Sequence, residues 1–317
     1  MANLPDKIKQ KFEKQHYEIV GNHSAVQICT WCKQSLLNEG YCYKQKFYGI
    51  NSHKCCQMTP ALTFCDQKCL FCWRPHEMDQ GIEMKNVDSP EKIIKESIQA
   101  QRKKLSGFKG NEKVNMKKFK EAQMPNQWAI SLSGEPTLYP RLGELIELIR
   151  KRGDSSFLVT NGQNPEVLEK LNENKQLPTQ LYVSLEAPTK ELHKKINVPL
   201  KENSWERLNK TLEILPKLNC RKVIRITVIR GMNDSYIEEF AKLLKKANPD
   251  FIEVKAYMFV GYSRKRMKLE NMPYHKEVKE FSEKLNKKLN WEIIDEKEES
   301  RVVLISNGEK CPKITEI

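Results

Sequence analysis

The sequence predicts an α/β fold of parallel βα units, and three observations support this prediction. Six short apolar segments of strand type alternate with amphipathic segments of helix type. The chain has 317 residues and is 39% hydrophobic, which suffices for one large barrel-type domain or two ordinary domains. Polar and cysteine-rich motifs recur where the apolar segments end. The alternation is typical of parallel sheets but does not by itself separate an open α/β barrel from a doubly wound sheet.

The expected elements follow one another in a regular order. The strands are expected at residues 58–64, 128–133, 156–160, 181–185, 222–229 and 251–259. The helices are recognised by apolar residues at helical spacing. These stripes are Leu142, Leu145, Ile146 and Ile149; Trp205, Leu208, Leu212 and Leu215; Ile237, Phe240 and Leu244; and Val278, Phe281, Leu285 and Leu289. In either architecture the loops at the carboxyl ends of the strands build the active site, so we expect the functional residues there.

Composition excludes some classes of protein and favours a polyanionic partner. No apolar run approaches the ~18 residues of a membrane span, and the first residues lack a signal-peptide stretch. We therefore expect a soluble cytoplasmic protein with no membrane partner. Lysine and arginine total 55 against 41 aspartates and glutamates, a formal charge of +14. Such an excess favours contacts with phosphates, although a lysine-rich solvated surface gives the same total.

A run of three cysteines predicts an iron–sulfur cluster. Cys65, Cys69 and Cys72 form a C-x3-C-x-aromatic-C string, and eight of the ten cysteines lie between Cys29 and Cys72. Clustering in one segment of a large chain favours metal binding over a disulfide framework. Three thiolates on a [4Fe–4S] cube leave one iron open for a substrate or cofactor. The alternative for this string is a zinc knuckle or a set of buried thiols.

The cysteine string resembles the radical S-adenosylmethionine (SAM) superfamily when it is taken together with Ser133-Gly134-Glu135-Pro136 after the second strand. This resemblance implies a partial (β/α)6 TIM-like barrel, with an N-terminal cysteine-rich extension. It also implies a [4Fe–4S] cluster whose open iron is chelated by SAM, which is cleaved on reduction to a 5′-deoxyadenosyl radical. The implied cluster ligands are Cys65, Cys69 and Cys72, and the implied SAM contacts are Phe71, Gly134, Glu135, Pro136, Asn161 and Ser184.

The segment upstream narrows the resemblance to the archaeal tRNA 4-demethylwyosine synthases. Cys29, Cys42 and Cys55 are spaced C-x12-C-x12-C, and the strings around Cys42, Phe71, Ser131, Gly261 and Ser300 occur in the order of that family. The similarity covers roughly residues 15–306. It implies a domain boundary near residue 57, between a segment at 1–57 that carries the second set of ligands and a barrel at 58–317.

The family resemblance also implies the reaction and its partners. Cys29, Cys42 and Cys55 would bind a second [4Fe–4S] cluster, and N1-methylguanosine at position 37 of tRNA-Phe would be condensed with two carbons of pyruvate. Lys44 would form a Schiff base with the keto group or offset its charge, since a lysine near a cationic centre can act as an amine nucleophile. Electrons would come from an external donor such as flavodoxin or ferredoxin, and the protein is expected to be a monomer.

Several residues and functions remain open at this stage. Cys32 and Cys56 are interpreted as incidental thiols. The basic stretches at 102–120 and 255–268 are candidate tRNA contacts, although the first can equally be a mobile solvated insertion. Two alternative functions are kept: a radical SAM enzyme that acts on another RNA or protein, and a non-enzymatic, zinc-stabilised RNA-binding protein.

Overall fold

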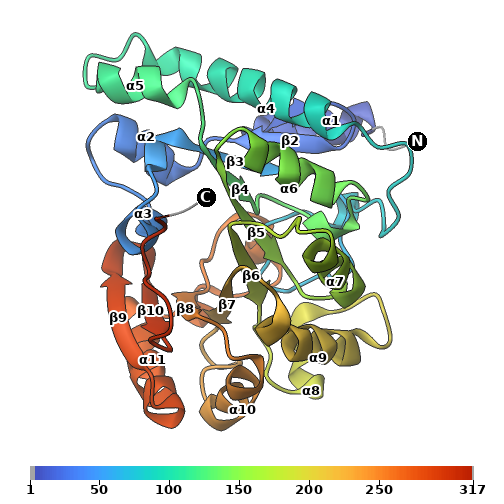
Figure 1. The fold of residues 1–317 in the computed structure, drawn as a ribbon, viewed down its shortest axis with the longest axis vertical. Helices are drawn as coiled ribbons and strands as arrows, with labels where there is room; N and C mark the ends of the chain where they lie inside the picture. The colour runs from blue at the N-terminus through green and yellow to red at the C-terminus, as the bar shows by residue number, and fades with distance from the viewer. Residues whose placement is uncertain (1–3, 316–317) are drawn as a thin grey trace.

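One mixed sheet of ten strands organises the protein (Figure 1). The computed structural model describes residues 4–315. Along the sheet the strands follow the order β1-β2-β3-β4-β5-β6-β7-β8-β10-β9. Their bounds are β1 Glu18–Val20, β2 Ser24–Gln27, β3 Cys55–Thr59, β4 Gln127–Ile130, β5 Ser155–Thr160, β6 Gln180–Ser184, β7 Arg221–Val228, β8 Phe251–Ala256, β9 Glu292–Lys297 and β10 Val302–Ser306.

Strands β3 to β8 form the six parallel strands of a partial barrel. Each pairs in parallel with the next in chain order, and the order never reverses. A doubly wound sheet would contain a reversal, so the strand order decides between the two architectures left open by the sequence. The predicted partial (β/α)6 barrel is confirmed. Antiparallel strands extend the sheet on both sides, with β1 and β2 beside β3, and β10 and β9 beside β8.

Helices cover the outside of the sheet (Figure 1). Their bounds are α1 Asp6–Lys14, α2 Thr30–Leu36, α3 Tyr43–Tyr48, α4 Pro90–Leu105, α5 Met116–Ala122, α6 Leu142–Lys151, α7 Pro165–Glu173, α8 Lys190–Asn197, α9 Ser204–Ile214, α10 Ile237–Ala247 and α11 His275–Leu289. The predicted apolar stripes are largely buried, for example Leu145, Phe240 and Leu285. Helix α4 begins where Ser89 caps the Lys92 amide and Pro90 presets the first turn. Within the described residues no helix is long and apolar enough to cross a membrane.

Three strands differ by more than one residue from the sequence-based expectation, and one of them is β4, which was expected at 128–133 but spans Gln127–Ile130. The first parallel strand was expected at 58–64 but spans Cys55–Thr59, and the last was expected to reach residue 259 but ends at Ala256. The backbone after Thr59 turns away instead, because the Thr59 hydroxyl accepts a bond from the Ala61 amide. One consequence is that Cys55 begins a barrel strand. The division into segments 1–57 and 58–317 stays a prediction.

The amino-terminal end of the barrel interior is filled by helix α3. Tyr43, Phe47 and Tyr48 of this helix pack on a cluster of inward-facing strand residues. These strand residues are Phe157, Tyr182, Val223, Phe251, Val302 and Leu304. Because α3 begins directly after Cys42, this packing also fixes the position of that cysteine.

Candidate active site

The loop after β3 presents the cysteine string and is fastened from three directions. The Cys65 amide donates to the Gly81 carbonyl, and the Leu70 amide donates to Ile196 at the end of α8. The Arg266 guanidinium donates to the carbonyls of Leu70, Cys72 and Arg74. Backbone bonds of this kind hold Cys65, Cys69 and Cys72 in one loop at the carboxyl ends of the strands, where the sequence predicted them.

The Gly-Glu-Pro loop after β4 packs directly on the loop that precedes Cys65. Gly134 has φ +72°, and a Cβ there would overlap the carbonyl oxygen of Ala61. The Glu135 amide donates to the Phe64 carbonyl at 2.8 Å. Only glycine tolerates both the backbone conformation and the close approach, which explains the residue type at position 134.

The Glu135 carboxylate joins the β4 and β5 loops. One oxygen, Oε1, accepts bonds from the amide and hydroxyl of Thr137 and from the Thr160 hydroxyl, at 3.1, 2.5 and 2.7 Å. The other oxygen, Oε2, accepts from the Asn161 amide at 2.8 Å. Burial and the nearby Asp66 carboxylate raise the pKa of Glu135 to about 7. The carboxylate therefore has a structural task, and the predicted contact of this motif with SAM stays a prediction.

The other predicted SAM contacts lie at or near the cysteine loop. The side-chain Nδ2 of Asn161 lies 4.0 Å from the Cys65 sulfur and donates to Asp66 at 2.6 Å. Ser184 ends β6 and is half-buried, and Phe71 packs partly against the cluster that contains Ile196 and Tyr257. The structure thus brings Asn161 beside Cys65, and the SAM contacts predicted for Asn161, Ser184 and Phe71 stay predictions.

Two residues beside the cysteine loop were not singled out as site residues from the sequence. The side-chain amide of Asn197, at the end of α8, lies 3.7 Å from the Cys69 sulfur and 3.4 Å from Glu186. Burial raises the pKa of Glu186 to about 7. Glu186 lies two residues beyond the end of β6, and this position after a strand could have marked it as a site residue in the sequence. No sequence motif marks Asn197.

The second cysteine trio combines three elements that are separate in sequence. Cys29 and Cys42 are the residues before α2 and α3, and Cys55 begins β3. The Cys42 amide donates to the Ser52 hydroxyl at 2.9 Å. Ser52 in turn donates to Gln45 of α3 through both its amide and its hydroxyl. This network links the segment before Cys55 to α3. Burial raises the pKa of all three thiols, and the Lys44 ammonium opposes this shift at each of them, so Lys44 lies close to the whole trio.

Lys44 lies inside the barrel, although its helix is short. Its side chain is buried, and Nζ lies 4.8 Å from the ring centres of both Phe157 and Tyr182. Burial and the nearby Arg225 guanidinium lower the pKa of Lys44, and Glu253 partly opposes this shift. A buried amine with a lowered pKa has the character that nucleophilic lysines need.

The thiols of both trios fit a cationic cluster. Burial raises the pKa of Cys29 to about 11 and raises the pKa values of Cys42, Cys55, Cys65 and Cys69 as well. Neighbouring thiols of the same trio raise the pKa values of Cys29, Cys55 and Cys69 further. Thiolates in such positions need a strongly electropositive partner, which an iron–sulfur core supplies. Within residues 4–315 no three His, Cys, Asp or Glu side chains converge on a point that one metal ion would occupy, and the separated irons of a cluster do not require such convergence.

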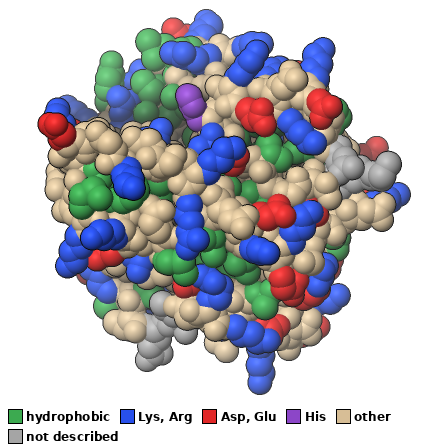
Figure 2. All heavy atoms as spheres, turned by 90° about the horizontal axis from the view of Figure 1, so that it is seen from above, with side chains coloured by type: hydrophobic (Ala, Val, Ile, Leu, Met, Phe, Trp, Pro, Cys, Tyr) green, Lys and Arg blue, Asp and Glu red, His purple; other side chains and the backbone are tan. Residues whose placement is uncertain are grey.

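The first basic stretch is an ordered part of the fold. Residues 102–120 cover the end of α4 and most of α5, and Phe108 and Phe119 pack against the cluster that contains Cys32. Glu121 accepts a bond from His53 at 2.7 Å, which connects α5 to the segment before Cys55. The stretch is therefore anchored to the fold by its apolar side chains, although most of its lysine and arginine side chains are exposed, and its contact with tRNA stays a prediction. Figure 2 shows Lys and Arg side chains spread over the side of the molecule that carries α4 and α5.

The second basic stretch divides into groups with different surroundings. Lys255 lies on β8 and faces the barrel interior, and Arg266 is bonded to the cysteine loop. Arg264 and Lys265 lie in the turn after β8, where they stack on Phe259 and Tyr262. Of the cations in this stretch, only those of this turn and the exposed Lys268 are available to a ligand at the rim of the barrel. The basic surface at the rim is therefore smaller than the sequence suggested.

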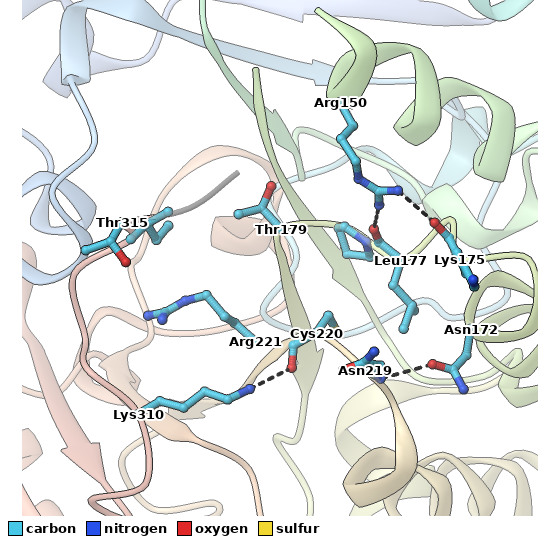
Figure 3. A pocket seen from close by; sticks show the side chains of 12 residues that line it. Arg150, Asn172, Lys175, Leu177, Thr179, Asn219, Cys220, Arg221, Lys310 and Thr315 are labelled. Atoms are coloured by element: carbon cyan, nitrogen blue, oxygen red, sulfur yellow. Dashed lines mark hydrogen bonds between the residues drawn. The ribbon is translucent and has the colours of Figure 1, made fainter. Parts of the chain in front are cut away.

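A pocket of about 570 Å³ lies at the opposite, amino-terminal ends of β6 and β7 (Figure 3). Three of its four cations, Arg150, Arg221 and Lys310, are bonded to the protein itself, whereas Lys175 is exposed. Arg150 donates to the carbonyls of Lys175 and Leu177, and Arg221 donates to those of Cys311 and Pro312. The Arg221 bonds attach the C-terminal segment to the base of the barrel. We therefore interpret the pocket as part of a structural contact and not as a second active site.

Two family models match this chain. The model described as Radical SAM superfamily matches residues 60–244, and the model described as Wyosine base formation matches residues 246–307. The first covers the cysteine string, the Gly-Glu-Pro loop and the strands β4 to β7. The second covers β8, β9, β10 and the basic turn after β8. The chain therefore contains a radical SAM domain, which implies SAM and a [4Fe–4S] cluster.

Full-length relatives agree with the family models. The chain is 52% identical to the S-adenosyl-L-methionine-dependent tRNA 4-demethylwyosine synthase of Pyrococcus abyssi, across 99% of this chain and 92% of that protein. It is 43% identical to the synthase of the same name from Methanocaldococcus jannaschii, across 96% and 97% of the two chains. A solved structure of TYW1 with a lysine-pyruvate adduct bound superimposes with a TM-score of 0.88 at 40% identity, across 98% of this chain and 99% of that one. These matches set aside the non-enzymatic zinc-protein alternative: the chain belongs to the tRNA 4-demethylwyosine synthases of the radical SAM superfamily.

Proposed function

We propose that this enzyme condenses N1-methylguanosine at position 37 of tRNA-Phe with two carbons of pyruvate, which closes the third ring of the base. One observation carries the proposal: the Lys44 amine lies inside the barrel, over two aromatic rings and among the second cysteine trio. The TYW1 structure with a lysine-pyruvate adduct supports a keto acid at this kind of lysine.

The two cysteine trios divide the cofactors between them. Cys65, Cys69 and Cys72 would hold the cluster that SAM chelates, and Cys29, Cys42 and Cys55 would hold a second [4Fe–4S] cluster. When bound and reduced, the first cluster and SAM supply a carbon radical that abstracts a hydrogen atom from the substrate. Asn161 and Asn197 would hold the sulfurs of Cys65 and Cys69 through weak N–H···S contacts.

Lys44 would activate the keto acid by forming a Schiff base. Its neutral amine attacks the keto carbon, a carbon–nitrogen bond forms, and the keto oxygen leaves as water. Burial and Arg225 lower the pKa of Lys44, which raises the fraction of neutral amine available. The rings of Phe157 and Tyr182 pack beside the amine and keep bulk water away from the imine.

The tRNA would approach at the carboxyl ends of the strands. The target base must leave its stack for its N1-methyl group to reach the radical, and aromatic and basic side chains at a rim suit an extruded base. Arg264 and Lys265, with Phe259 and Tyr262, offer such a rim, and the basic face of α4 and α5 would hold phosphates. An external donor such as flavodoxin or ferredoxin would supply electrons to a monomeric enzyme.

The proposal is tested with the reconstituted enzyme under anaerobic conditions. The enzyme is incubated with SAM, reductant and tRNA-Phe that carries N1-methylguanosine, with and without pyruvate, and the nucleosides are identified by mass. We expect a tricyclic nucleoside only when pyruvate is present, and none with the Lys44→Arg variant. A tricyclic product without pyruvate, or no product with it, contradicts the proposal.

A further inference from the structure

The barrel interior contains a second lysine that has no acidic partner. Lys255 lies on β8 and is half-buried, and its Nζ lies 4.8 Å from the ring centre of Tyr43. Within residues 4–315 its ammonium forms no hydrogen bond and no ion pair. Ammonium groups inside proteins are normally paired, so an unpaired one in a substrate chamber points to a ligand that supplies the missing negative charge.

The Glu253 carboxylate beside Lys255 is already used by other groups. Glu253 accepts bonds from the hydroxyls of Tyr43 and Tyr48 at 3.0 and 2.8 Å. It also accepts two bonds from the Arg225 guanidinium at 3.0 and 3.1 Å. Three cations, Lys44, Arg225 and Lys255, therefore surround one carboxylate that is already bonded by four donors. Glu186, which accepts a bond from Thr227 opposite Lys255, and the thiols of the second trio are further acidic groups in this chamber, but within residues 4–315 no hydrogen bond or ion pair joins any of them to the Lys44 or Lys255 ammonium.

The strand register places Lys255 on the active-site side of this network. In the strand register, Glu253 of β8 lies opposite Arg225 of β7, and Lys255 lies opposite Thr227. Lys255 is the next residue of β8 that faces the interior, on the side of the carboxyl ends of the strands. Side chains alternate along a strand, so Lys255 faces the same interior as Glu253. Burial, together with repulsion by Arg225 and Lys44, lowers the pKa of Lys255 to about 8, whereas Cys42 and Glu253 act in the opposite direction. Lys44 and Lys255 therefore share one chamber.

We propose that Lys255 is a positioning residue that binds the carboxylate of the keto acid whose keto carbon reacts with Lys44. This inference rests on the proposed function. A 2-keto acid carries an electrophilic carbon directly bonded to a carboxylate. The chamber offers the Lys44 amine to the electrophilic carbon and the unpaired Lys255 ammonium to the carboxylate. The ammonium of Lys255 donates a charge-assisted hydrogen bond to a carboxylate oxygen, which orients the keto carbon toward Lys44. The same contact gives selectivity for keto acids over uncharged carbonyl compounds.

Reductive trapping measures this contact without turnover. Cyanoborohydride delivers hydride to the imine and converts it to a stable amine, and peptide mass mapping locates and quantifies the adduct on Lys44. The reconstituted enzyme is titrated with pyruvate and, in parallel, with methyl pyruvate, in which a neutral ester replaces the carboxylate. Four proteins are compared: the wild type, Lys255→Met, Lys255→Arg and Lys222→Met. Lys222 is the matched control, because it lies on the neighbouring strand β7, faces the outer side and is near Asp250.

For Lys255→Met we expect the pyruvate concentration at half-maximal trapping to rise about 10- to 100-fold, as for the loss of one charge-assisted hydrogen bond. Half-maximal trapping of methyl pyruvate should stay within about threefold of the wild type. Lys255→Arg should restore most of the affinity for pyruvate, and Lys222→Met should behave as the wild type. An unchanged pyruvate titration for Lys255→Met overturns the inference.

Iron content separates this role from a structural one. If Lys255 serves mainly as a counter-charge for the second cysteine trio, Lys255→Met loses iron and traps both carbonyl compounds poorly, and that result also overturns the inference. The proposed function fails in a different way: the wild type then forms no pyruvate adduct at Lys44, or forms it on Lys255. An adduct at Lys44 that is indifferent to Lys255 contradicts the present inference alone.

Discussion

The substitution Glu135→Gln tests the structural role of the carboxylate in the Gly-Glu-Pro loop. In the wild type three donors meet Oε1, and the Asn161 amide meets Oε2. An amide side chain keeps one oxygen, and its best orientation leaves that oxygen with the three donors. The new NH2 group then faces the Asn161 amide, so that two buried donors lose their acceptors.

The magnitude follows from these two unsatisfied groups. Each buried donor without a partner costs about 1–3 kcal/mol, which gives a loss of about 2–6 kcal/mol in the free energy of unfolding. For a chain of this length each kcal/mol lowers the melting temperature by about 2 °C, so we expect a decrease of about 4–12 °C. SAM affinity should fall as well, because Asn161 lies beside Cys65 and would lose its anchor.

The assay compares anaerobic thermal melts, followed by circular dichroism, with SAM binding by equilibrium dialysis. Glu144→Gln is the control, because this residue lies on α6 in a surface ion pair with Arg141 and its side chain is 49% exposed. Its loss should change the free energy of unfolding by at most about 1 kcal/mol. If Glu135→Gln melts at the temperature of Glu144→Gln and binds SAM like the wild type, the reasoning about this loop is refuted.

Three further results are expected. Arg225→Met leaves the fully buried Glu253 without its only hydrogen-bonded cation within the described residues and should lower the free energy of unfolding by about 3–5 kcal/mol in urea titrations; a loss below 1 kcal/mol would argue against a tightly coupled ion pair. Cys32→Ala and Cys56→Ala should each retain about eight iron atoms per chain, two cubes of four, and a fall to about four in either variant would make that cysteine a ligand. The pKa of His193 is lowered to about 4, chiefly by burial, so between pH 6.5 and 5 the unfolded chain binds a proton that the folded chain does not. The wild type should therefore lose about 2 kcal/mol more stability over this interval than His193→Gln, and equal losses would contradict the shift.

The fold class and the cysteine motifs were predictable because their signals are local. Continuous apolar strands and amphipathic helices are visible within ten to fifteen residues, and Cys65, Cys69 and Cys72 fall within eight. The order of the strands in the sheet cannot be read from local sequence. A doubly wound sheet therefore remained an alternative until the structure showed that β3 to β8 pair in chain order. The short edge strands β1 and β2 were missed because three or four residues give too little periodicity.

The interior network was not predictable, because it depends on long-range register. Arg225 and Glu253 are bonded across two strands, and Tyr43 reaches the same carboxylate from a helix 210 residues away in sequence. From sequence, Lys255 appeared to belong to a basic rim, but the alternation of β8 turns it into the barrel. Glu135 illustrates the same limit: its position in a motif was visible, whereas its four donors come partly from the next loop along the sheet.

The measurement that tests the central claim most directly is made on one variant, in which Cys29, Cys42 and Cys55 are all changed to alanine. Iron, SAM cleavage and tRNA nucleosides are measured on the same anaerobically reconstituted sample. If the second trio holds a second cluster that serves the keto acid, the variant keeps about half of the wild-type iron and still cleaves SAM under reduction, but it makes no tricyclic nucleoside. Unchanged iron, or a tricyclic nucleoside formed at the wild-type level, would contradict the account.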